Sequence, residues 1–99
     1  MKIDEAVEKF IYEEEVVGGK SKMTIKSYKD DLMQFKNYIN EYEGKDNIEE
    51  VDTMSIRSFL GFLNRCDISK RSINRKLSSI RGFYKYLTKF TLVSQNYAK

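Results

Sequence analysis

The sequence has no histidine and no proline, and it has one cysteine and five glycines among 99 residues. Without histidine, the chain cannot assemble a Ser-His-Asp triad, a Cys-His pair or a histidine-ligated zinc site. The 15 acidic residues follow no metal-loop pattern, and the glycines form no GxGxxG or GxxxxGK[ST] phosphate loop. A small standalone enzyme is therefore the least favoured class of function, and we expect no cofactor and no metal.

The compartment is predicted from what the chain lacks. The single cysteine, Cys66, excludes an internal disulfide and favours a reducing cytoplasm. No apolar run approaches the roughly 18 residues of a membrane span. The first residues, MKIDEAVEKF, lack the apolar core of a signal peptide. We expect one small cytoplasmic domain without a membrane partner.

The apolar pattern predicts an all-α protein, because apolar residues recur at spacings of three and four and no strand-like alternation persists. The predicted helices cover residues 2–16, 22–43, 53–65 and 70–89. Ser21, Asp52 and Ser69 are the predicted N-caps, and Gly44 is the predicted C-cap. Short linkers favour a compact four-helix bundle. The predicted core positions are Ile3, Ala6, Val7, Phe10, Ile11, Ile25, Tyr28, Leu32, Phe35, Ile39, Tyr42, Ile56, Phe59, Leu60, Leu63, Ile73, Leu77, Ile80, Tyr84 and Leu87.

The net charge of +3 is unevenly distributed along the chain. Residues 70–99 hold eight basic residues and no acidic one, whereas residues 1–16 hold two lysines and six acidic residues. Repulsion within the last third opposes a compact state. The sequence therefore predicts either a polyanionic partner or neutralisation by acidic residues folded nearby, such as those of the first helix.

On a helical wheel of the fourth helix, the residues opposite the apolar stripe include Arg71, Arg75, Lys85 and Lys89, and Lys70 and Arg81 flank them. Gly82 falls in the middle of that opposite face, where a small residue would allow a close approach to a bulky surface. The major groove of DNA admits one helix. A second basic flank runs along the second helix, where lysines recur every seven residues. A solvated face is the competing interpretation of that flank.

The segments SKMTIKSYKDDLMQFKNYI, VDTMSIRSFLGFL and ISKRSINRKLSSIRGFYKYL together resemble the N-terminal core-binding (SAM-like) domain of tyrosine recombinases, the phage integrases and Xer-like site-specific recombinases. The resemblance extends over about residues 3–96. It implies an orthogonal four-helix bundle that clamps DNA, with its second and fourth helices facing the major groove. It also implies a separate catalytic domain carrying an Arg/Lys/His/Arg set and a nucleophilic tyrosine, which cannot be located in this chain.

The expected function is therefore a non-catalytic domain that binds double-stranded DNA in integration or recombination. Residues 1–96 would form this domain, and 97–99 would begin the linker to the catalytic domain. The resemblance implies that the full-length protein forms oligomers on DNA, while the fragment is expected to be a monomer. The alternative is a helical protein-interaction module that uses Phe62 and Phe90. The candidate DNA contacts are Lys22, Lys26, Lys29, Lys36, Lys70, Arg71, Ser72, Asn74, Arg75, Ser78, Arg81, Lys85 and Lys89.

Overall fold

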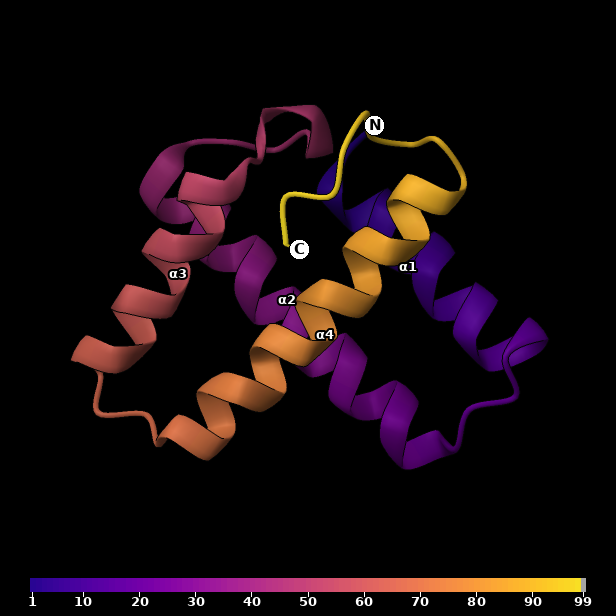
Figure 1. Ribbon diagram of the computed structural model, residues 1–99, viewed down its shortest axis with the longest axis horizontal. Helices are drawn as coiled ribbons and strands as arrows, with labels where there is room; N and C mark the ends of the chain where they lie inside the picture. Colours follow the sequence, from indigo (N-terminus) through magenta and orange to yellow (C-terminus); the bar gives the residue numbers. More distant parts are fainter. Residues whose placement is uncertain (99) are drawn as a thin grey trace.

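The computed structural model describes residues 1–98, and its elements confirm the all-α prediction. They are α1 (Ile3–Tyr12), η1 (Glu13–Val17), α2 (Lys22–Glu43), η2 (Ile48–Glu50), α3 (Thr53–Arg65) and α4 (Lys70–Lys89). Figure 1 shows α2 and α4 crossing near the middle of the molecule, with α1 and α3 on opposite sides. The bounds of α2, α3 and α4 agree with the prediction.

The predicted first helix changes type along its length. α1 ends at Tyr12, and the chain continues as the π-helical turn η1, which is closed by a 2.9 Å bond from the Gly18 N–H to the Glu13 carbonyl oxygen. A Cβ atom on residue 18 would lie only 2.9 Å from the carbonyl oxygen of Glu14. The absence of a side chain at Gly18 therefore permits the wider turn, a feature that apolar periodicity does not predict.

The predicted caps are confirmed at four helix ends. Ser21, Asp52 and Ser69 each accept a hydrogen bond from the backbone N–H three residues later, at 3.0 to 3.2 Å. Gly44 follows α2 in the left-handed conformation, at φ 63°. These local interactions define where α2, α3 and α4 begin and where α2 ends.

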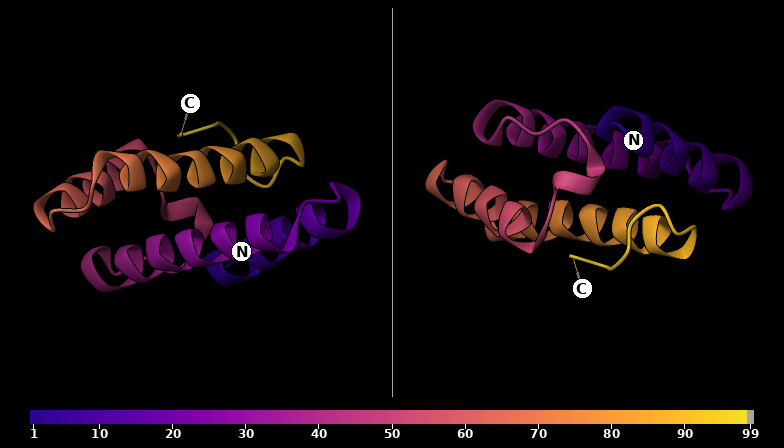
Figure 2. Two further views of the ribbon diagram at one scale, coloured as in Figure 1. Left: turned by 90° about the horizontal axis from the view of Figure 1, so that it is seen from below. Right: turned by 90° about the horizontal axis from the view of Figure 1, so that it is seen from above.

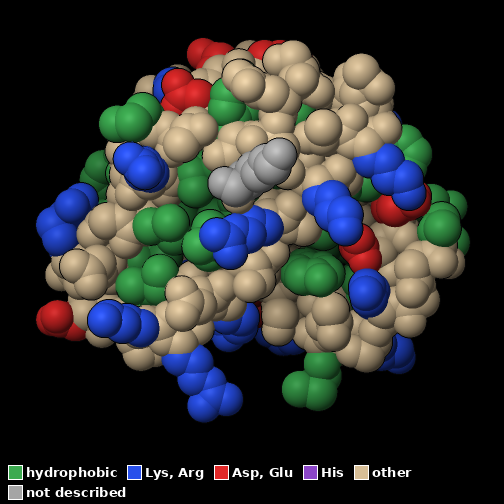
Figure 3. All heavy atoms as spheres, in the orientation of Figure 1, with side chains coloured by type: hydrophobic (Ala, Val, Ile, Leu, Met, Phe, Trp, Pro, Cys, Tyr) green, Lys and Arg blue, Asp and Glu red, His purple; other side chains and the backbone are tan. Residues whose placement is uncertain are grey.

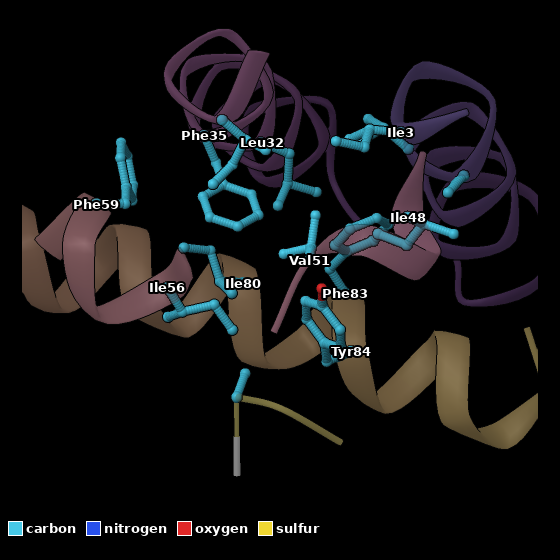
Figure 4. Close-up of a cluster of buried hydrophobic side chains, with 14 of the residues drawn as sticks. Ile3, Leu32, Phe35, Ile48, Val51, Ile56, Phe59, Ile80, Phe83 and Tyr84 are labelled. Atoms are coloured by element: carbon cyan, nitrogen blue, oxygen red, sulfur yellow. The ribbon is translucent and has the colours of Figure 1, made fainter. Parts of the chain in front are cut away.

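The helices form two layers, one containing α1 and α2 and the other containing α3 and α4 (Figure 2). Apolar side chains from both layers, and from the connection that carries η2, meet between them (Figure 4). The largest fully buried side chains are Tyr84, Phe10, Phe35, Phe59, Phe83, Ile3, Leu32, Ile39, Ile48, Leu63, Ile80 and Leu87. Within residues 1–98, no helix has both the length and the apolar character required to cross a membrane.

One predicted core residue is exposed, and some buried residues were not predicted. Tyr42 is 59% exposed, because it lies near the end of α2 and its ring packs at the surface beside that of Phe62, with centroids 5.3 Å apart. Phe83 was not predicted in the core, yet it is fully buried. Its ring lies 5.7 Å from that of Phe10, because α1 packs against the flank of α4 next to the predicted stripe. The buried face of α4 is therefore wider than the apolar stripe predicted from the sequence of this helix alone.

After α4 the chain turns back across the outer side of the α3–α4 layer (Figures 1 and 2). The hydroxyl of Thr53 donates to the carbonyl oxygen of Tyr97 at 3.2 Å, and the Arg81 Nε–H donates to that of Ala98 at 3.4 Å. Ala98 is only 6% exposed. Residues 97 and 98 thus pack against the bundle.

Candidate nucleic-acid interface

Most of the predicted contact residues lie on the surface. Lys and Arg side chains line the outer side of α4, on the face that Figure 3 presents to the viewer. Of the 13 candidates, only Lys36 and Ser72 are half-buried. The exposed ones are Lys22, Lys26, Lys29, Lys70, Arg71, Asn74, Arg75, Ser78, Arg81, Lys85 and Lys89.

The sequence left open whether acidic residues of the protein neutralise the basic residues of α4, and in the structure one acidic residue does so at two positions. Asp31 of α2 accepts a 2.8 Å hydrogen bond from Arg75 and a 3.2 Å hydrogen bond from Lys76. The reason is the crossing of α2 over α4, which brings an acid from a distant part of the sequence against the basic helix. Within residues 1–98, no glutamate of α1 or η1 forms an ion pair with α4.

Asp31 was missed as a structural residue, although the sequence contained a signal. It stands beside Leu32 and four residues before Phe35, so it falls on the apolar face of α2. Its side chain is 0% exposed, and the Ser79 hydroxyl donates to it at 2.8 Å. A buried carboxylate requires charged and hydrogen-bonding partners. An acid within an apolar stripe therefore predicts a basic partner on the facing helix.

The lysines of α2 do not form one continuous surface. Lys36 Nζ lies 3.3 Å from a carboxylate oxygen of Asp4 in α1, and Lys29 lines a hollow shared with α1. These two lysines therefore lie on the flank that α1 covers. Lys26 forms a 2.8 Å ion pair with Asp30. The hydrogen bond from Lys26, and secondarily the positive charge of Arg75, hold the pKa of Asp30 below its ordinary value.

Gly82 does not lie in the middle of an open face, contrary to the prediction. It is half-buried, and a Cβ built there would lie 3.7 Å from the ring of Phe10 in α1. The small residue therefore faces a neighbouring helix of the same domain. Phe90 is 46% exposed, whereas Phe62 is half-buried beside the rings of Tyr38 and Tyr42.

A hollow of about 280 Å³ lies where the first half of α2 meets the first half of α4. Arg75 lines it, and the hydroxyls of Ser27 and Ser78 accept and donate no hydrogen bond within residues 1–98. The guanidinium and the hydroxyls can all donate hydrogen bonds to an anion. The residues around the hollow are Met23, Thr24, Ser27, Tyr28, Arg75, Ser78 and Ser79.

Metal-binding clusters are absent from the part of the chain that the structure describes, where no three His, Cys, Asp or Glu side chains are grouped to hold an ion. Tyr84 is the only fully buried phenol in residues 1–98, and its hydroxyl has no hydrogen-bond partner there. Burial raises the pKa of this hydroxyl above its ordinary value. The group is therefore held neutral in the core.

Comparison with known proteins identifies the family. The family described as "Phage integrase, N-terminal SAM-like domain" matches residues 7–90. The chain belongs to this family. The match includes α2, α3 and α4 in full, and it begins within α1. The SAM-like fold predicted from the sequence is thereby confirmed.

Several relatives are recombinases by name. The chain is 42% identical to "Tyrosine recombinase XerC" of Treponema denticola over 76 residues, which are 77% of this chain and 24% of the relative. It is 36% identical to XerC of Lacticaseibacillus casei over 73 residues, or 74% and 24% of the two chains. It is 39% identical to "Tyrosine recombinase XerD" of Rickettsia conorii over 67 residues, or 68% and 21%.

The chain spans about a quarter of the length of these relatives. No solved structure matches it at a significant level.

Proposed function

We propose that this chain is the DNA-binding domain of a tyrosine site-specific recombinase or integrase, and that it clamps duplex DNA during integration or recombination. The family match and the recombinase names of its relatives support the recombinase role. The proposed partner is double-stranded DNA in the cytoplasm.

The exposed basic side of α4 is the observation that carries this proposal. Six exposed cations lie along the helix, and within residues 1–98 only Arg75 among them has an acidic partner. The helix has 20 residues, so it extends for about 30 Å and can follow a groove over several base pairs. Ser72, Asn74 and Ser78 would add neutral hydrogen bonds. The six cations are Lys70, Arg71, Arg75, Arg81, Lys85 and Lys89.

Salt dependence tests the proposal directly. If about five to eight phosphates are neutralised, the slope of log K against log salt should be about −0.9 for each. We expect binding of a short mixed-sequence duplex at about 50 mM salt that weakens steeply as salt is added. Absence of binding at low salt, or a flat slope, would contradict the proposal.

A double variant tests whether α4 forms the DNA-binding surface. Arg75→Ala combined with Lys85→Ala should weaken binding to all duplexes and make the salt slope shallower by about 1.8, since two phosphate contacts are lost. Lys2→Ala combined with Lys9→Ala is the matched control, because it removes the same charge from α1 and the residue before it. Equal losses in both double variants would show that net charge alone, and not α4, drives binding.

We further propose that strand cleavage belongs to a separate catalytic domain of the full-length protein. The absence of histidine in this chain supports that division, and residues 97–99 would begin the connection. A reading frame that continues after Lys99 into an Arg…His-x-x-Arg…Tyr set is the expected result. A stop codon at that point would contradict it. The fragment is expected to sediment as a monomer, and the full-length protein to form oligomers on DNA.

A protein-interaction module is the second candidate, and one observation favours it. Val17 at the end of η1 is 70% exposed, and it lines the same hollow as the exposed Phe90. Apolar side chains that remain in contact with water can be covered by a partner protein. Binding to a partner that does not weaken as salt is added, together with no affinity for duplex DNA, would favour this function over the first.

A further inference from the structure

Asp31 and its partners connect the core to the exposed side of α4. The Arg75 Nη2 group donates to Asp31 Oδ1 at 2.8 Å, and Lys76 Nζ donates to the same oxygen at 3.2 Å. The Ser79 hydroxyl donates to Oδ2 at 2.8 Å. The carboxylate is 0% exposed, whereas the Arg75 side chain is 55% exposed. One end of Arg75 is therefore held from inside the protein while the rest of it faces solvent.

The charges around Asp31 do not cancel. One carboxylate is shared by two cations, so the cluster keeps a net charge of +1. An arginine has five N–H donors, and only one from Arg75 is hydrogen-bonded to Asp31. Donors therefore remain for a ligand. The guanidinium is also ordered before any ligand arrives, which lowers the entropy lost on binding.

The hollow beside Arg75 has the chemistry of a phosphate seat. Ser27 comes from α2 and Ser78 from α4, and their hydroxyls have no hydrogen-bond partner within residues 1–98. Like the Arg75 guanidinium, both hydroxyls can donate hydrogen bonds to an anion. A volume of about 280 Å³ is large enough for one phosphate group with its sugar. Two helices thus supply hydrogen-bond donors to the lining of one hollow on the proposed DNA surface.

We propose that this hollow seats one backbone phosphate of duplex DNA, and that Asp31 is the positioning residue that holds Arg75 at its wall. Arg75, Ser27 and Ser78 bind the phosphate, whereas Asp31 acts only through Arg75. The inference rests on the proposed function, because it assumes that DNA is the ligand.

Removing the charge of Asp31 distinguishes a positioning role from a purely electrostatic one, because the two predict opposite changes in DNA affinity. Asp31→Asn deletes a negative charge next to a DNA-binding surface, so electrostatics alone predicts tighter binding. Positioning predicts weaker binding, by about threefold to tenfold, because the guanidinium must then be ordered on binding. The probe is a short mixed-sequence duplex at about 50 mM salt.

Asp30→Asn provides the matched control. It removes the same charge from the adjacent position of α2, where Asp30 is exposed and paired with Lys26 instead of Arg75. We expect Asp30→Asn to bind DNA as tightly as the wild type or more tightly, and Asp31→Asn to bind more weakly. Tighter binding by both variants would overturn the inference.

A double-mutant cycle distinguishes positioning from a general loss of structure. Arg75→Ala should weaken binding and make the salt slope shallower by about 0.9. Adding Asp31→Asn to Arg75→Ala should then cause no further loss of affinity, because no guanidinium is left to position. A merely structural role of Asp31 would give additive losses, and this result would also overturn the inference.

Arg75→Lys keeps the test decisive if Asp31→Asn does not fold. The variant keeps the charge but loses the planar fork, and the exposed position should tolerate it. We expect at least threefold weaker binding, and a similar loss for Ser27→Ala combined with Ser78→Ala. Unchanged binding in both variants would refute the phosphate seat. Failure of the wild type itself to bind DNA would instead refute the proposed function.

Discussion

Replacing Tyr84 with phenylalanine should stabilise the domain. Tyr84 is 0% exposed, and its hydroxyl has no hydrogen-bond partner within residues 1–98. The ring packs edge-on against Phe83 and Tyr97, with centroids 5.7 Å and 6.2 Å away. Tyr84→Phe keeps these ring contacts and removes only the buried oxygen. Figure 4 shows this oxygen pointing into the apolar cluster between the two layers.

The size of the effect follows from the cost of the buried hydroxyl. An unsatisfied buried polar group costs about 1 to 3 kcal/mol. We expect Tyr84→Phe to raise the free energy of unfolding by about 1 kcal/mol or more. That change corresponds to an increase of about 4 to 8 °C in the thermal midpoint for a domain of this size. Urea titration followed by circular dichroism measures it.

Tyr42→Phe is the matched control, because the Tyr42 side chain is 59% exposed and its hydroxyl can bond to water. This variant should leave the free energy of unfolding within about 0.5 kcal/mol of the wild type. A clear loss of stability in Tyr84→Phe would show that the hydroxyl has a partner and would refute the reasoning.

The pH dependence gives a second measurement on the same residue. Burial raises the pKa of Tyr84 in the folded state, so above about pH 10 the unfolded chain loses this proton while the folded protein keeps it. The unfolded state then binds fewer protons, and the stability of the wild type falls as the pH rises. Tyr84→Phe should lack this part of the decline, and an identical decline in both proteins would contradict the assignment.

Three further outcomes are expected. Gly82→Ala should stabilise the domain by about 0.5 to 1 kcal/mol, because the added Cβ would make an ordinary 3.7 Å contact with Phe10. DNA affinity should not change, and a loss of affinity for duplex DNA would show that Gly82 contacts the DNA. Phe59→Ala should lower the free energy of unfolding by about 3 to 5 kcal/mol, since the ring is fully buried, and a loss below about 1 kcal/mol in urea would contradict its place in the core. The N–H of Ser55 holds the pKa of Asp52 below its ordinary value, so this stabilisation is present above about pH 4 and is lost as the pH falls through the folded pKa. Asp52→Asn keeps the N-cap, and its urea midpoint should fall less at acid pH than that of the wild type. An equal fall in both proteins would show that other carboxyl groups cause the loss of stability.

The helices were predictable because their ends are determined locally. A serine or aspartate side chain bonds to an N–H three residues away, and a glycine takes the left-handed conformation after α2. These interactions require no knowledge of the rest of the fold. The π-helical turn η1 was not predictable in this way, because it depends on how the chain after α1 turns towards α2, with Gly18 close to the Glu14 carbonyl.

The errors at the candidate interface have a common origin. A helical wheel describes one helix and leaves out its neighbours, so it placed Gly82 and Lys36 on open faces. In the structure α1 packs beside both residues, through Phe10 and Asp4 respectively. The helical wheel correctly predicted which α4 residues are exposed where no other helix covers them, as at Arg71 and Lys85.

Asp31 shows how a buried carboxylate can reduce the repulsion among the basic residues of a surface. Eight basic residues and no acid in the last 30 residues would repel one another if all faced solvent together. An exposed acid would relieve this repulsion but would also repel a phosphate backbone. A carboxylate buried beneath Arg75 and Lys76 lowers the repulsion within the domain, and it lies behind the cations as seen from outside. The fold therefore offsets its own charge from the inside while most of the cations on the outer side of α4 remain available to a polyanion.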